Sequence, residues 1–207
     1  MMTARQSDVI FMLYNKAYFL NKRKISHEVL TEVEMALPYI VGKTVLDVAC
    51  GTGRHGYLLE YYGYKVTYFD ISKEALKNIW WSEDKICGDF LSYDFGNRLW
   101  DTVVSFQFIE HLNNKDLCIA LTKMKGLAKY RVINVTPHPM HIEYDRDPTH
   151  VKRSFNELLD IYFSVFPKTT IITYDNKHRG SFLSLVKGVF ERLRPHYFEN
   201  VMFVSEV

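Results

Sequence analysis

The chain has 207 residues, of which 47% are hydrophobic and 24% charged, and its formal net charge is +2. This length and apolar content are typical of one globular α/β domain, so we expect a single domain over residues 1–207. The near-neutral charge does not favour nucleic acid as a partner, although local basic clusters leave such a partner open. The three cysteines are isolated from one another, and no signal peptide or membrane-spanning run is visible. Both observations predict a cytoplasmic protein.

The N-terminal region carries two stretches of apolar residues at helical spacing. The first covers residues 8–20, and the second starts near Ser26 and ends before Pro38. We therefore predict two helices within residues 8–38.

Residues 45–56 read VLDVACGTGRHG, which predicts a buried parallel strand, a tight glycine turn and the start of a helix. Gly51 and Gly53 allow positive φ and close approach of a ligand, and the helix start offers unpaired N–H groups. The glycines also satisfy G-x-G-x-x-G, so a dinucleotide oxidoreductase is an alternative. Asp47, at the end of the strand, would repel a pyrophosphate and attract an ammonium or sulfonium. The charge therefore favours a cationic cofactor.

Two further acidic residues lie at or just after the ends of strands of the same predicted sheet. The strand over residues 65–72 contains Asp70 near its end, where a ribose-hydroxyl acceptor is expected in a βαβ unit. Ser72 is placed to cap the next helix. A short strand over residues 85–87 is followed by Gly88 and then by Asp89, which is also compatible with an ordinary turn.

The fourth and fifth strands are predicted at residues 101–106 and 131–136, with a helix over residues 115–127 between them. Ligands of open parallel sheets lie beyond the carboxyl ends of the strands. The segment after the fourth strand and the loop over residues 137–150 should therefore face the same crevice as the glycine turn.

The loop over residues 137–150 is the predicted substrate loop. His138, His141 and His150 lie in it beside two acids, Glu143 and Asp145. Because imidazole titrates near neutral pH, we expect at least one of these histidines to be functional.

The C-terminal part is predicted to contain strands over residues 168–174 and 200–204, separated by an insertion over about residues 176–198. Within it, residues 182–194 have apolar positions at helical spacing and basic residues at both ends. Most such helices pack on their own domain, but peripheral membrane contact is an alternative.

Taken together, residues 45–76 resemble motif I and the following acidic motif of the class I S-adenosylmethionine (SAM) dependent methyltransferases, in the subgroup with Gly-Thr-Gly-Arg-His. The resemblance implies an α/β fold: a doubly wound, seven-stranded, mostly parallel sheet with an antiparallel last strand. It also implies that helices within residues 8–38 form a lid and that SAM is the cofactor. The implied cofactor-binding residues are Asp47, Ala49, Gly51, Thr52, Gly53, Asp70, Ile71, Asp89, Phe90 and Phe106.

The resemblance implies transfer of a methyl group from SAM to an oxygen or nitrogen of a small molecule. Glu110-His111-Leu112 is similar to a Glu-His-Leu signature common among small-molecule members. The displacement mainly requires alignment in a dry site, and a general base is needed only for a nucleophile that holds its proton. We predict His111 and His150 as the catalytic bases, with Glu110 in reserve.

Two alternatives remain within the same fold. The small-RNA 2′-O-methyltransferases carry Glu-x-x-Glu-His after the fourth strand and a later His, which together bind a divalent metal. Here Gln107 replaces the first glutamate and removes a charge, so we expect no metal requirement. The second alternative is a protein that binds SAM without catalysis and acts as a partner subunit.

Overall fold

The computed structural model describes residues 25–141, 144–174, 184–185 and 199–207. The strands are β1 (Thr44–Val48), β2 (Lys65–Asp70), β3 (Lys85–Cys87), β4 (Trp100–Phe106), β5 (Ala128–Pro137), β6 (Thr169–Tyr174), β7 (Ser184–Leu185) and β8 (Asn200–Glu206). The α-helices are α3 (His27–Ala36), α4 (Arg54–Tyr61), α5 (Lys73–Leu76), α6 (Asn114–Leu127) and α7 (Phe155–Val165), and the 3-10 helices are η1 (Leu37–Tyr39), η2 (Ile109–His111) and η3 (Tyr144–Arg146). The helix predicted over residues 8–20 lies outside the described residues.

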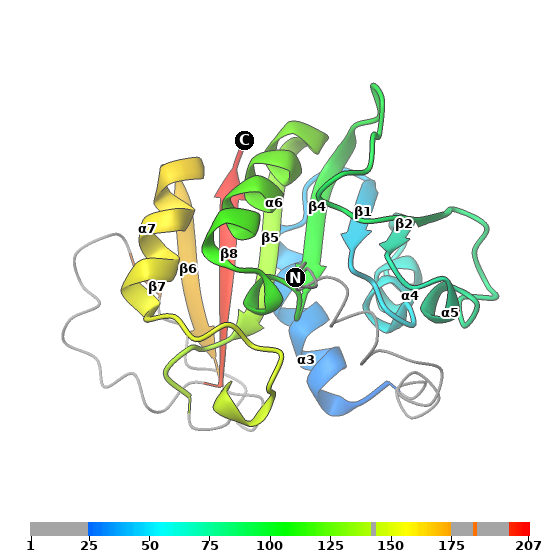
Figure 1. Ribbon diagram of the computed structural model, residues 1–207. Helices are drawn as coiled ribbons and strands as arrows, with labels where there is room; N and C mark the ends of the chain where they lie inside the picture. The colour runs from blue at the N-terminus through cyan, green and yellow to red at the C-terminus, as the bar shows by residue number, and fades with distance from the viewer. Residues whose placement is uncertain (1–24, 142–143, 175–183, 186–198) are drawn as a thin grey trace, which may run out of the picture.

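The strands form one sheet in the order β3-β2-β1-β4-β5-β8-β6-β7 (Figure 1). The neighbours from β3 to β5 are parallel, and β8 lies antiparallel between β5 and β6. The predicted fold class, a mostly parallel sheet with an antiparallel last strand, is confirmed.

The short strand β7 was not predicted. Its two residues pair antiparallel with β6 and add an eighth strand at the sheet edge. The expected helix over residues 182–194 is therefore wrong at Ser184 and Leu185, because the edge of β6 offers backbone groups that an extended segment can pair with. The rest of that helix lies outside the described residues.

Helices cover both faces of the sheet because the apolar side chains of the strands alternate between two cores. Leu46 of β1 belongs to the core beneath α6 and α7, whereas Val45 belongs to the core beneath α3, α4 and α5. Side-chain caps start two of the helices near the glycine turn, with Ser26 and Ser72 as the N-caps of α3 and α5. No helix in the described part of the chain is long and apolar enough to cross a membrane.

Asp47 occupies a core position on the side of β1 that faces α4. Its side chain is 1% exposed, and its Oδ2 atom has no hydrogen-bond partner among the described residues. Burial raises the pKa of Asp47 to about 7. Gly56 of α4 makes this packing sterically feasible: a Cβ there would lie 2.2 Å from Cε1 of Tyr68 and 3.1 Å from Oδ2 of Asp47.

Gly56→Ala should therefore destabilise the fold, since the added methyl group meets a fully buried ring with little freedom to move. Overpacking of this kind costs about 1–3 kcal/mol. Gly126→Ala in α6 is the matched control. A Cβ at Gly126 meets nothing within 4 Å, so this change should stabilise the protein by roughly 0.5–1 kcal/mol. Denaturant unfolding of both variants measures the two opposite shifts, and two shifts of the same sign would contradict the packing argument.

Asp47→Asn tests the cost of burying the carboxyl group. The folded pKa of about 7 lies above the usual 3.8, so between these values the folded protein holds a proton that the unfolded chain has lost. Stability then falls as the pH rises through this window. The difference corresponds to a cost on the order of 4 kcal/mol. We expect Asp47→Asn to be more stable than the parent at pH 8, with the gain shrinking towards pH 4 in denaturant titrations.

Asp101→Asn is the control of opposite sign. The backbone N–H groups of Lys43 and Thr44 donate to Asp101 Oδ2 at 2.9 and 3.0 Å and hold the pKa of that carboxyl well below its usual range. Its contribution to stability is present above the unfolded pKa and is lost as the pH falls. This variant should be less stable than the parent at neutral pH, with the loss narrowing in acid. The same pH profile for both variants would contradict the assignments.

Candidate active site

A cavity of about 380 Å³ lies at the carboxyl ends of β1, β2 and β4. Its size is in the range of small-molecule sites. It is lined by Glu28, Val29, Glu32, Ala49, Cys50, Gly51, Thr52, Arg54, His55, Asp70, Ile71, Ser72, Phe106, Gln107, Phe108, Glu110, His111, Leu112, Asp147 and His150. Residues from α3, the glycine turn, η2 and the loop after β5 thus surround one space.

The glycine turn has the backbone conformation that its sequence predicts. Gly51 and Gly53 have φ values of 56° and 76°, and Gly53 is the N-cap of α4. Ala49 also has a positive φ, 58°, which is uncommon for a residue with a Cβ and was not predicted. The turn is therefore held in a strained shape at the cavity wall, as is common at ligand sites.

Asp70 connects this turn to the end of β2. Its Oδ2 accepts a hydrogen bond from the Gly51 N–H at 2.8 Å, and its Oδ1 accepts one from the Ser72 N–H at 2.7 Å. Burial raises the pKa of Asp70, and these two N–H groups oppose the shift. Because each carboxylate oxygen has more than one lone pair, Asp70 retains capacity to accept from a ligand in the cavity.

The predicted site residues divide into two groups. Those that line the cavity are Ala49, Gly51, Thr52, Asp70, Ile71, Phe106, His111 and His150. Those that do not line it are Asp47, Gly53, Asp89 and Phe90. Asp47 lies beneath the turn for the reason given above, and Gly53 turns the backbone into α4. Among the predicted loop histidines, His138 and His141 also lie outside the lining.

Asp89 and Phe90 have structural contacts of their own. The Asp89 carboxylate accepts from the Leu91 N–H at 3.0 Å and from the Ser92 hydroxyl at 3.1 Å, which is the turn role that the sequence left open. Phe90 is 4% exposed and packs edge-on against Phe69, with ring centroids 5.6 Å apart. A role of either residue at the adenine of a cofactor stays a prediction.

Glu32 of α3 is a cavity residue that sequence analysis missed. It is 1% exposed, with Oε2 2.6 Å from Nε2 of His55 and Oε1 accepting from Nε2 of Gln107 at 2.6 Å. The signal was present, since Glu32 shares the apolar stripe of α3 with Val29 and Val33. An acid in such a stripe indicates a buried, partnered charge.

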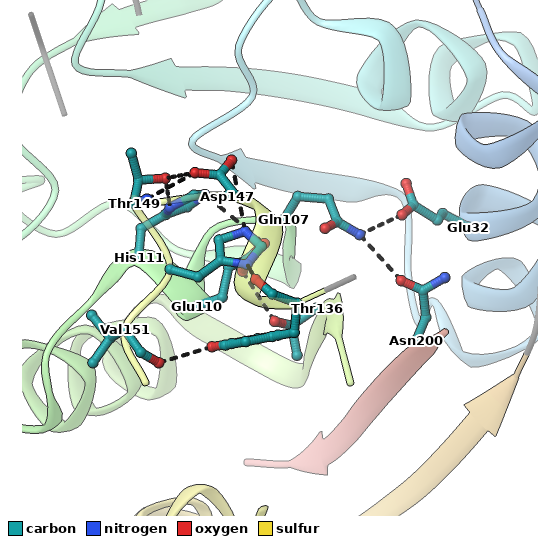
Figure 2. A network of polar contacts seen from close by, with 11 residues as sticks. Glu32, Gln107, Glu110, His111, Thr136, Asp147, Thr149, Val151 and Asn200 are labelled. Atoms are coloured by element: carbon teal, nitrogen blue, oxygen red, sulfur yellow. Dashed lines mark hydrogen bonds and ion pairs between the residues drawn. The ribbon is translucent and has the colours of Figure 1, made fainter. Parts of the chain in front are cut away.

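Gln107 is directed away from Glu110. Figure 2 shows its amide reaching towards Glu32 and Asn200, and Nε2 lies 3.5 Å from Oδ1 of Asn200. Its φ of 57° is also positive. Gln107 was expected to occupy the place of a metal-ligating glutamate, but its side chain instead ties the end of β4 to α3 and β8.

Glu110, His111 and His150 form a cluster in the lining of the cavity. Figure 2 shows Glu110 and His111 on the side of Gln107 that is away from Glu32. One potential metal-ligating atom of each lies within 4.8 Å of those of the other two. Oε2 of Glu110 accepts from the Thr136 hydroxyl at 3.0 Å, whereas Oε1 is buried without a hydrogen-bond partner among the described residues. Burial raises the pKa of Glu110 to about 8 and lowers the pKa of His111 to about 4, so this imidazole is neutral at pH 7.

The loop after β5 holds the two histidines in place. The Val151 N–H donates to the Glu110 carbonyl at 2.8 Å, which docks the loop on η2. The Thr149 hydroxyl lies 2.8 Å from Nδ1 of His111 and donates to Oδ1 of Asp147 at 2.6 Å. The His111 and His150 rings, which are far apart in the sequence, thus lie together with their centroids 5.0 Å apart.

Comparison with known proteins shows that part of the chain is similar to methyltransferases. The family model for a methyltransferase domain matches residues 45–130, from β1 to the start of β5. No curated protein matches the sequence. A crystal structure of a SAM-dependent methyltransferase from Archaeoglobus fulgidus has a TM-score of 0.72 at 22% identity, covering 92% of this chain and 99% of that chain.

Two further solved structures share the fold. Magnesium protoporphyrin IX methyltransferase from Synechocystis PCC 6803 with bound SAM has a TM-score of 0.65 at 15% identity and covers 99% of both chains. The small RNA methyltransferase HEN1 has a TM-score of 0.63 at 18% identity, covering 85% of this chain and 25% of that chain. Residues 45–130 therefore match a methyltransferase domain, and the chain shares its fold with SAM-dependent methyltransferases of known structure.

Proposed function

We propose that this enzyme transfers the methyl group of SAM to an oxygen or nitrogen of a small-molecule acceptor. The observation that carries the proposal is the shared cavity, in which the glycine turn and Asp70 lie on one side and the Glu110, His111 and His150 cluster lies on the other. A cofactor and an acceptor can therefore meet within one cavity. The Synechocystis enzyme is named for a small molecule, magnesium protoporphyrin IX, which is consistent with such an acceptor here.

The cofactor is proposed to bind along the glycine turn. Gly51 and Thr52 offer backbone close to the ligand, and Asp70 accepts from the ribose hydroxyls. Glu28 and Glu32 from α3 add acidic groups to the same lining, and negative charge favours a sulfonium over an anionic dinucleotide. This arrangement also supports the proposed lid role of the N-terminal region, since α3, the helix described there, contributes lining residues.

His111 is proposed as the proton acceptor, with His150 beside it. The acceptor atom attacks the methyl carbon, the bond from sulfur to carbon breaks, and the methylated atom becomes more acidic as the new bond forms. Its proton can then pass to a neutral imidazole even of low basicity. Since burial keeps His111 neutral at pH 7, the ring is in the form that takes a proton.

A second candidate function is metal-assisted methylation of a ribose hydroxyl in RNA. It is favoured by the Glu110, His111 and His150 cluster and by the likeness to the HEN1 structure. The residues fit a divalent cation, because Oε1 of Glu110 is a buried oxygen without a described partner and imidazoles are common ligands of such ions. A bound cation would polarise the hydroxyl that is methylated. Glu110, His111 and His150 would hold it, while Gln107 lies too far towards Glu32 to take part.

Asp70→Ala tests the cofactor assignment. Loss of hydrogen bonds to a charged acceptor costs roughly 1.5–3 kcal/mol, so SAM affinity should fall by about one to two decades in titration calorimetry. Asp160→Ala in α7 is the matched control, since Asp160 is exposed and does not line the cavity, and it should leave SAM affinity near that of the parent. NAD should give no heat with either protein. Unchanged SAM affinity in a folded Asp70→Ala variant would remove the ribose assignment.

His111→Gln and His150→Gln test the chemistry, in a labelled-methyl assay over metabolite and RNA pools. A general base contributes about two to four decades of rate, so turnover should fall while SAM affinity stays. Under the leading proposal, a chelator leaves the parent activity unchanged. Activity that is lost with chelator, restored by manganese or magnesium and directed at RNA would instead select the second candidate. Parent-like turnover of both variants would show that neither histidine is the base.

A further inference from the structure

We propose that Asp147 and Thr149 are positioning residues, which keep the proton of His111 on Nδ1 and so direct the Nε2 lone pair towards Glu110 and the cavity. This inference deepens the proposed function and rests on it for its catalytic meaning. The tautomer of His111 itself can be measured without an activity assay.

The direction of the hydrogen bonds follows from the chemistry of the three groups. The Asp147 side chain is 43% exposed, and an ionised carboxylate only accepts. Its Oδ1 accepts from the Thr149 hydroxyl at 2.6 Å and from the Thr149 backbone N–H at 2.8 Å. The single hydroxyl proton of Thr149 is therefore committed to Asp147. The contact of 2.8 Å between Thr149 Oγ1 and Nδ1 of His111 must then use a hydroxyl lone pair, with Nδ1–H as the donor.

A neutral imidazole has one N–H, so a proton on Nδ1 leaves the lone pair on Nε2. Nε2 of His111 lies 4.0 Å from Oε1 of Glu110, at the cavity. The same nitrogen is the one that can take a proton from an acceptor or bind a cation. The Asp147 and Thr149 pair thus selects the competent tautomer for either chemistry of the site.

His150 reaches the same tautomer by a different route. Its Nδ1 lies 2.8 Å from the Tyr144 carbonyl oxygen, which can only accept, so Nδ1 carries the proton there as well. A backbone carbonyl survives any side-chain substitution, whereas Thr149→Val removes the hydroxyl that contacts Nδ1 of His111. Asp147 also lies near His150, with Oδ2 3.9 Å from Nε2 of that ring. Changes at Thr149 should therefore alter His111 and spare His150, which provides an internal reference for the Thr149 variants.

The first measurement is the imidazole tautomer, read from long-range ¹H–¹⁵N correlation spectra of the full chain at neutral pH with chelator present. In the parent, both rings should show protonated Nδ1 and unprotonated Nε2. Thr149→Val removes the hydroxyl while keeping the side-chain shape, and His111 should lose this preference. Thr149→Ser should restore it. Thr173→Val, at a buried threonine of β6, should leave both rings unchanged.

Asp147→Ala gives a sharper expectation. Without the carboxylate, the Thr149 hydroxyl is free to donate to Nδ1 of His111, and the ring proton should move to Nε2. A folded parent with His111 protonated on Nε2, or a Thr149→Val variant with an unchanged His111 tautomer, would overturn the positioning role.

Turnover separates this inference from the proposed function. Loss of one hydrogen bond of ordinary strength corresponds to about a tenfold effect, so Thr149→Val should lower kcat about tenfold with KM and SAM affinity unchanged, and Thr149→Ser should rescue kcat. A shifted tautomer with unchanged kcat would support the positioning role and overturn the assignment of His111 as the proton acceptor. An unshifted tautomer would overturn the positioning role whatever the activity.

Discussion

The site depends first on the Asp70 carboxylate, which accepts backbone N–H groups from both Gly51 and Ser72. These bonds join the turn after β1 to the end of β2, and the Cys50 N–H adds a bond to the Phe69 carbonyl at 3.0 Å. A turn with several positive φ values is costly in isolation. Its attachment to the neighbouring strand fixes its shape at the cavity wall.

The opposite wall is organised around a second buried acid, Glu110. The two most buried acids of the lining, Glu32 and Glu110, differ in how completely their oxygens are hydrogen-bonded. Both oxygens of Glu32 have close partners, in His55 and Gln107. Within the described part of the chain, only Oε2 of Glu110 has one, in Thr136. An incompletely paired buried carboxyl destabilises a fold, and such groups gather at functional sites. Stability alone would favour an apolar residue in place of Glu110. Its position beside two imidazoles therefore supports the chemical role proposed for this cluster.

The two walls are held in different ways. Backbone N–H groups of the glycine turn donate to the Asp70 carboxylate and to the Phe69 carbonyl, both in the neighbouring strand β2. On the His111 side, the contacts among Asp147, Thr149 and His111 join side chains of separate segments. A wall built from side chains can change with few substitutions, which suits the part of the site that selects the acceptor and its chemistry.

The sequence by itself determined the sheet, the glycine turn and Asp70, because these features follow from local periodicity and from backbone rules that act over a few residues. It also placed His111 and His150 at one edge of the sheet, since the carboxyl ends of parallel strands meet there. Only the tertiary structure decided which acids face the cavity. Asp47 and Glu32 both lie on buried faces. The packing of α4 against the sheet encloses Asp47, whereas the packing of α3 brings Glu32 into the cavity lining. The direction of Gln107 and the contact of Thr149 with His111 join residues 75 and 38 positions apart, and no local pattern specifies contacts at that separation.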